Sequence, residues 1–239
     1  RPPCPAKQKT RCRRRRGQPS RRRIHRGHLP GDAPNRRPGH RHRQDGHDFE
    51  GIVPELNLID SSSVRFIFPH APVQAITVNR GMEMRAWYDI LSMDELQREV
   101  DVAGIERSTQ LVNQLIQKEI DRGISTKNIL LVGFSQGGVL ALHAGLRYPE
   151  PLAGIIALSA YLPTLESLKT QRAPANNNTP IFMSHGIIDS VVAVEMGKAA
   201  FDGLKELGYR IEWHDYVMEH SVCVEEIEQI ALFINTVFK

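Results

Sequence analysis

Short apolar runs alternate with stretches of helical periodicity from residue 45 to the end of the 239-residue chain. Runs of strand length predict strands over residues 66–68, 128–133, 152–158, 180–184 and 209–217. Apolar residues at spacings of three and four predict helices over residues 105–123, 136–147, 194–207 and 222–238, and Ser92 with Glu95 resembles a capping box ahead of the first of them. This alternation is typical of a mostly parallel sheet with helices on both faces, so we predict an α/β fold.

The first 44 residues differ in composition from the rest of the chain. They hold 14 Arg and 2 Lys against one acid, Asp32, whereas residues 45–239 hold 15 basic and 26 acidic side chains. Only six of these 44 residues are hydrophobic, so burial cannot offset the conformational entropy that folding them would cost. We therefore predict a disordered basic segment over residues 1–44 and one globular domain over residues 45–239.

Three interpretations of the basic segment stay open. Its clustered Arg residues suit the phosphates of a nucleic acid, although the segment has no aromatic residue for base stacking. A mitochondrial-type transit peptide would be an amphipathic helix rich in Ser, whereas this segment is rich in proline and has only Ser20. The interpretation favoured here is that the segment has no evolved role and is non-native sequence, such as an incorrect reading frame upstream of Asp45 produces.

The cysteines and the charge of the globular part indicate its cellular environment and its class of ligand. The three cysteines, Cys4, Cys12 and Cys223, imply no disulfide framework, which favours a reduced, cytoplasmic environment. No run of about 18 apolar residues is present, so we expect no membrane span. The acidic balance of residues 45–239 argues against a nucleic acid as the ligand of this part.

The stretch Gly133-Phe134-Ser135-Gln136-Gly137-Gly138 matches the nucleophile-elbow motif G-x-S-x-G. A predicted strand precedes it and a predicted helix follows it, and small residues on both sides of the serine allow the sharp turn that this motif requires. The turn would lift Ser135 above the sheet edge as a nucleophile. The backbone amide of Gln136, at the start of the helix, would donate to a developing oxyanion. A Gly-Ser turn with no chemical role is the structural alternative.

A serine hydroxyl needs a base to take its proton and an acid to orient that base. Asp189 follows the predicted strand at residues 180–184, and His220 follows the predicted strand at residues 209–217. Their order along the chain is the one expected after such an elbow. Because the carboxyl ends of parallel strands share one edge of a sheet, we predict Ser135, Asp189 and His220 as a catalytic triad. The chemistry needs no metal and no organic cofactor.

The other histidines have different interpretations. His185 directly follows its predicted strand and is interpreted as a histidine at the rim of the site or a hydrogen-bonded structural residue, with a catalytic part as the alternative. His143 falls within a predicted helix and His214 within a predicted strand, so neither is a base carried by a loop. The spacing of His40 and His42 would suit only a weak metal site, and we predict none.

Further motifs surround the elbow. They are GHDF at 46–49, PHAP at 69–72, AWYD at 86–89, LSAYL at 158–162, HGIID at 185–189 followed by VV at 191–192, and EHSV at 219–222. With the elbow they resemble the carboxylesterase, lysophospholipase and acyl-protein thioesterase family of α/β-hydrolases over residues 45–239. The resemblance implies an α/β-hydrolase fold, the same triad, and acyl-ester substrates that are small molecules or acylated proteins. It also places Trp87 and Tyr88 beside the pocket as substrate-binding residues, with Trp87 as a plain core aromatic the alternative.

One part of the family pattern is absent from this chain. In the family, a strand and a His-Gly-Leu-Gly-type loop precede the stretch that here begins at Asp45, and the loop donates a second amide to the oxyanion. This chain has GHRHRQ at 39–44 instead. We therefore expect the sheet to lack an N-terminal strand beside the one that leads to Ser135, with backbone groups unpaired and apolar side chains exposed. Loss of one oxyanion donor costs about 100- to 1,000-fold in turnover.

Taken together, the motifs predict a serine hydrolase that cleaves carboxylic ester or thioester bonds through an acyl-serine intermediate. Two alternatives stay open. One is a catalytically impaired hydrolase-like protein without its oxyanion loop, and the other is a nucleic-acid-associated protein that acts through the Arg-rich segment. The sequence leaves acyl chain length and oligomeric state open, a homodimer being one arrangement.

Overall fold

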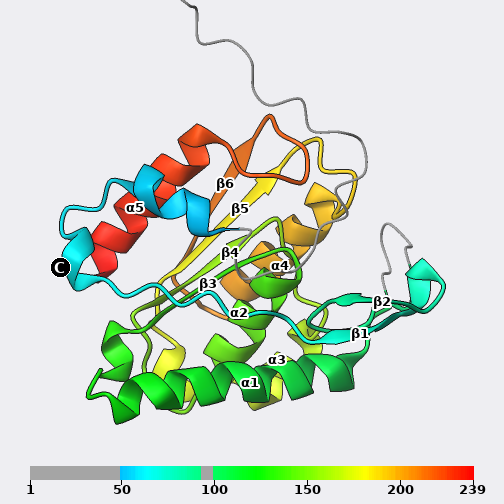
Figure 1. Cartoon of the computed structure of the whole chain (residues 1–239), viewed down its shortest axis with the longest axis horizontal. Helices are drawn as coiled ribbons and strands as arrows, with labels where there is room; N and C mark the ends of the chain where they lie inside the picture. Colours follow the sequence, from blue (N-terminus) through cyan, green and yellow to red (C-terminus); the bar gives the residue numbers. More distant parts are fainter. Residues whose placement is uncertain (1–48, 93–98) are drawn as a thin grey trace, which may run out of the picture. The chain divides into compact units, whose positions relative to one another are not determined.

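A computed structural model describes residues 49–92 and 99–239 (Figure 1). Its four-stranded sheet is parallel throughout, in the order β3-β4-β5-β6, and a separate antiparallel hairpin joins β1 to β2. The strands are β1 (Val73–Ile76), β2 (Met82–Arg85), β3 (Leu130–Phe134), β4 (Gly154–Leu158), β5 (Ile181–Gly186) and β6 (Ile211–Tyr216). The helices are α1 (Val102–Asp121), α2 (Gln136–Arg147), α3 (Leu165–Gln171), α4 (Val194–Glu206) and α5 (Val224–Val237), with short 3-10 helices that include η2 (Glu50–Leu56).

Helices cover both faces of the parallel sheet. Strands β4 and β5 are buried along their whole length, which explains why their sequences are continuous apolar runs. Helices α2, α3 and α4 pack on the face that carries Ile155 and Met183. Helix α5 and η2 pack on the opposite face, which carries Ile156 and Phe182 (Figure 1). The predicted α/β fold is confirmed.

Most of the predicted elements are present, with ends that shift by up to three residues. Helix α2 has the bounds predicted for it, and Gly208, at a φ of +87°, follows the end of α4 as expected of a terminating glycine. His185 was expected just after its strand but lies inside β5, because pairing with β6 continues through His185 to Gly186.

The strand predicted at residues 66–68 is wrong, since these residues belong to no strand. Pro69 and Pro72 have no backbone N–H to give to a ladder, and the first strand begins only after them. The rings of Phe66 and Phe68 stack with centroids 6.2 Å apart, and Phe66 packs against the core under α5. This apolar run therefore reflects packing rather than strand pairing.

Three short elements escaped prediction, namely the β1–β2 hairpin and α3. Their four to seven residues are too few to display a periodicity, and the hairpin strands mix apolar and polar side chains. Helix α1 begins after Asp101, whose Oδ1 accepts the Gly104 N–H at 2.9 Å as an N-cap. The capping box suggested at Ser92 and Glu95 falls partly on residues 93–98, which lie outside the described residues.

Strand β3 lies at an edge of the sheet. Within residues 49–92 and 99–239 it pairs only with β4, and Val132, in the middle of its apolar sequence, is 53% exposed. The expected absence of a strand beside the one that leads to Ser135 concerns residues before 49, which lie outside the described residues, and stays a prediction. The basic segment at residues 1–44 lies outside the described residues. None of the helices in the described ranges is long and apolar enough to cross a membrane.

Candidate active site

Ser135 occupies the turn between β3 and α2, with φ 55° and ψ −122°. A residue with a side chain rarely adopts this backbone conformation, which costs on the order of 1–3 kcal/mol and persists only where the surrounding structure enforces it. The backbone enforces it here, because the Ser135 N–H donates to the Leu158 carbonyl at 2.8 Å and the Ser135 carbonyl accepts the Val139 N–H at 3.1 Å. Strained turns of this kind are frequent at functional sites.

Two glycines make the turn sterically possible. A Cβ on Gly133 would lie 2.1 Å from the backbone of Gly137, and a Cβ on Gly138 would lie 2.6 Å from the Ala160 side chain. Real Cβ atoms do not approach so closely. The glycines of the motif are therefore required where α2 crosses back over β3 and β4.

Gln136 is the first residue of α2, where backbone amides have no partner inside the helix. Its side chain is buried and turned toward the preceding part of the chain. Its Oε1 accepts the Trp87 N–H at 2.9 Å, and its Nε2 donates to the Tyr88 carbonyl at 3.0 Å. The sequence did not indicate this clamp, which fixes the segment at 87–88 against the start of α2.

Trp87 and Tyr88 have different surroundings. The Trp87 indole Nε1 lies 3.9 Å from the place of a Cβ on Gly137, so this ring borders the elbow. Tyr88 has no exposed surface, and its hydroxyl is 3.5 Å from that of Tyr161. Tyr88 therefore presents no surface to a ligand here, and it supports the site through its carbonyl bond to Gln136.

Asp189 and His220 meet at the carboxyl ends of β5 and β6. Asp189 Oδ2 lies 2.6 Å from His220 Nδ1, and Asp189 Oδ1 accepts the backbone N–H groups of Val191 and Val192, both at 2.8 Å. Burial raises the pKa of Asp189, but the bonds from His220 and the two amides outweigh it and lower the pKa below the ordinary value of 3.8. A charged Asp189 holds the Nδ1–H of His220, which leaves Nε2 available as a base.

His220 lies on the loop at residues 217–223, here called the His220 loop. Its ring packs against that of Phe134, the residue before Ser135, with centroids 4.6 Å apart. The loop passes directly over the end of β5, since a Cβ on Gly186 would lie 2.3 Å from the Met218 carbonyl oxygen and 2.6 Å from that of Glu219. The predicted serine, acid and histidine therefore come to one edge of the sheet.

The two buried histidines other than His220, His185 and His143, are both hydrogen-bonded. His185 is fully buried, with Nε2 2.9 Å from the Val192 carbonyl and 3.5 Å from Asp189 Oδ2, and burial lowers its pKa. His143 contacts the Thr164 hydroxyl at 2.9 Å, and burial lowers its pKa to about 4. Within the described ranges, no group of three or more His, Cys, Asp and Glu side chains is placed to bind a metal. His40 and His42 lie outside those ranges.

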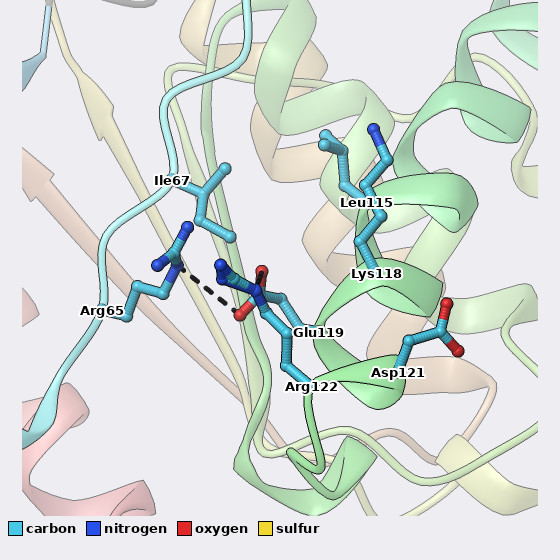
Figure 2. A pocket seen from close by; sticks show the side chains of 7 residues that line it. All are labelled: Arg65, Ile67, Leu115, Lys118, Glu119, Asp121 and Arg122. Carbon is cyan, nitrogen blue, oxygen red and sulfur yellow. Dashed lines mark ion pairs between the residues drawn. The ribbon is translucent and has the colours of Figure 1, made fainter.

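A surface cavity of about 390 Å³ lies away from these residues, between the end of α1 and the chain that follows η3 (Ser61–Ser63) (Figure 2). Arg65 and Arg122 both approach the Glu119 carboxylate, at 3.6 Å each. Both arginine side chains are more than half exposed, so these ion pairs contribute little to stability. No residue of the predicted site lines this cavity.

Comparison with known proteins agrees with the geometry. A family model described as Phospholipase/Carboxylesterase matches residues 46–238. Acyl-protein thioesterase 1 of Neurospora crassa is 47% identical over 181 residues, which cover 72% of this chain and 73% of that protein. Acyl-protein thioesterase 1 of Mycosarcoma maydis is 41% identical over 189 residues, which cover 74% and 79%. The crystal structure of Arabidopsis thaliana SOBER1 matches with a TM-score of 0.77 at 32% identity, over 82% of this chain and 94% of that one. The chain therefore belongs to the phospholipase/carboxylesterase family of α/β-hydrolases and is a serine hydrolase of carboxylic ester or thioester bonds.

Proposed function

We propose that Ser135, Asp189 and His220 form the catalytic triad of this hydrolase. The observation that carries the proposal is the 2.6 Å contact between His220 Nδ1 and Asp189 Oδ2, beside the strained turn of Ser135. A buried, charged carboxylate at Nδ1 fixes the tautomer that a serine nucleophile needs and stabilises the imidazolium that forms.

The reaction then has two halves. His220 Nε2 takes the hydroxyl proton as Ser135 Oγ attacks the acyl carbonyl, and the Gln136 N–H donates to the oxyanion. The imidazolium gives its proton to the leaving alcohol or thiol as the carbonyl re-forms, which leaves an ester between the acyl group and Ser135. Water attacks this ester with His220 again as the base, and the acid is released as Ser135 regains its proton.

We further propose acylated proteins as the substrate class, with a fatty acyl thioester as the bond cleaved. The relatives from Neurospora crassa and Mycosarcoma maydis are acyl-protein thioesterases. Apolar side chains on the two loops of the site suit an acyl chain. Ile187 and Ile188 are 46% and 56% exposed, and Val217 is 83% exposed.

The test compares hydrolysis of an oxygen ester and a thioester with the same acyl chain by wild type and Ser135→Ala. Wild type should cleave both, and an S-acylated peptide as well, whereas Ser135→Ala should cleave none of them. Full activity of Ser135→Ala would refute the nucleophile assignment. Cleavage of the oxygen ester alone would refute the thioester proposal and leave the triad standing.

A second candidate is a hydrolase of reduced activity, and the exposed edge of β3 favours it. The family's loop for the second oxyanion amide would fall before residue 49, outside the described residues. Restoring an upstream strand and Gly-rich loop should then raise turnover by about 100- to 1,000-fold. Equal turnover with and without the restored segment would contradict this candidate.

Other expectations from the sequence stay predictions. We expect the protein to be located in the cytoplasm and to form a homodimer. A role of the Arg-rich segment in nucleic-acid binding would give duplex binding that falls steeply with salt and disappears when residues 1–44 are deleted.

A further inference from the structure

Glu226 is a fully buried carboxyl group that the proposed mechanism does not use. It lies in the first turn of α5, and its side chain has no exposed surface. The neighbouring acid of the same turn, Glu225, is exposed. Acidic side chains are rarely buried completely unless they are paired, so the position of Glu226 calls for a physical reason.

Few groups face this carboxyl. The Ser184 hydroxyl on β5 donates to Glu226 Oε1 at 2.6 Å, while Oε2 is buried and has no hydrogen-bond partner. Ionisable groups near it include Tyr216 on β6 and Cys223 at the start of α5. His214 on β6 is paired in register with Ser184, and its ring stacks on that of Tyr216. Among the described residues, no lysine or arginine interacts electrostatically with Glu226. A negative charge here would therefore be buried without a counter-ion, which is unfavourable.

The carboxyl joins two structures that carry the site. Its helix begins directly after Cys223, the last residue of the His220 loop. Ser184 lies two residues before Gly186, over which that loop passes without room for a Cβ. The Glu226–Ser184 bond thus ties the anchor of the His220 loop to the strand on which the loop rests.

We propose that Glu226 is a positioning residue for His220. The neutral carboxyl of Glu226, bonded to Ser184, holds the start of α5 on β5 and so holds the His220 loop against Asp189. The inference rests on the proposed function of His220. Burial raises the pKa of Glu226 to about 7, although the Ser184 bond and a backbone bond from Cys223 lower it. The Glu226 carboxyl is thus neutral at acidic pH and becomes negatively charged as the pH rises through 7. The charge weakens the packing of the start of α5 on β5.

Three variants test this on the full chain. Glu226→Gln keeps an acceptor for Ser184 and cannot ionise, so it mimics the neutral acid. Ser184→Ala removes the donor, and Glu228→Gln neutralises an exposed acid of the same helix as the matched control. Steady-state kcat and KM are measured from pH 5.5 to 9 with a p-nitrophenyl ester, together with near-UV circular dichroism to verify folding.

We expect Ser184→Ala to lose about 10- to 100-fold in kcat with little change in KM, because a misplaced base slows the chemical step. Glu226→Gln should match wild type at pH 6 and exceed it increasingly above pH 7, and Glu228→Gln should follow wild type throughout. A Glu226→Gln to wild-type activity ratio that does not change with pH, or a folded Ser184→Ala with wild-type kcat, would overturn the inference. These outcomes leave the proposed function intact if Ser135→Ala is inactive, whereas an active Ser135→Ala would defeat the proposed function itself.

Discussion

Two buried carboxyl groups near the site, Asp189 and Glu226, differ in their hydrogen bonds and in the direction of their pKa shifts. Asp189 receives two backbone amides at 2.8 Å and the His220 ring at 2.6 Å. Glu226 receives one hydroxyl at 2.6 Å and leaves its second oxygen unpaired. Burial raises the pKa of both, yet the pKa of Asp189 is lowered overall and that of Glu226 is raised to about 7.

The difference teaches that the balance between burial and hydrogen-bond donors decides whether a buried acid is charged. Asp189 keeps its charge because the His220 ring and two backbone amides donate to it, whereas the hydrogen bonds to Glu226 do not outweigh its burial. Asp189 is therefore suited to stabilise an imidazolium. Glu226 is suited to join a helix to a strand without placing a second negative charge near the site.

Replacing each of the two carboxyl groups by an amide should give the largest difference in kcat. Asp189→Asn should lower kcat by about 10³- to 10⁴-fold, because an amide no longer favours the required His220 tautomer. Glu226→Gln, with the same change of atoms, should keep kcat within about threefold at pH 6, since the acceptor for Ser184 is retained. Steady-state kinetics on the ester substrate measure both, and comparable losses in the two variants would contradict the account.

Gly186→Ala should give the next largest effect. The new Cβ would lie 2.3 Å from the Met218 carbonyl oxygen, so the His220 loop must move. A displacement of this size should cost about 10- to 100-fold in kcat. Gly51→Ala is the matched control, because a Cβ there meets nothing within 4 Å. Wild-type kcat in a folded Gly186→Ala protein would show that the close contact does not position His220.

The pH dependence of unfolding should sharpen the contrast. The pKa of Glu226 rises from 4.5 to about 7 on folding. As pH increases from about 4.5 to 7, the unfolded chain ionises this group while the folded protein keeps it protonated. The contribution of Glu226 to the free energy of unfolding should therefore fall across this window, by on the order of 3 kcal/mol, and level off above it, whereas the lowered pKa of His143 acts in the opposite direction.

Urea titrations of wild type and Glu226→Gln at pH 4.5, 6 and 8 measure this effect. The variant lacks the ionisation, so its stability relative to wild type should increase from pH 4.5 to pH 8. Glu228→Gln should show no such trend. Parallel pH curves for wild type and Glu226→Gln would mean that Glu226 is not neutralised by folding.

The smallest expected effect concerns the turn at Ser135. Glycine adopts a φ of 55° with ψ −122° far more readily than residues with a side chain. The free energy of unfolding of Ser135→Gly should therefore be about 1 kcal/mol higher than that of Ser135→Ala, and both variants should be inactive. A thermal melt compares them, and greater stability of the alanine variant would mean that the turn stores no strain.

The sequence predicted the central part of the fold well, because its signals are local. The apolar runs of β4 and β5 follow from burial on both faces, and the glycines around Ser135 follow from the steric demands of the turn. Asp189 and His220 could be predicted because the topology of a parallel sheet brings strand ends to one edge.

The rest depends on packing between distant segments. Glu226 in sequence resembles any acid in the first turn of a helix, and only the seating of α5 on β5 buries it against Ser184, 42 residues earlier. The clamp from Gln136 to the Trp87–Tyr88 segment has the same character. The strand predicted at residues 66–68 was wrong because an apolar run indicates burial and does not by itself indicate strand pairing.

Covalent labelling tests the central claim most directly. The intact chain is treated with one equivalent of a fluorophosphonate, digested and mapped by mass spectrometry. The account predicts one adduct, on Ser135, formed much more slowly in His220→Gln and absent from Ser135→Ala. An adduct on another residue, or labelling of Ser135 at an unchanged rate without His220, would contradict it.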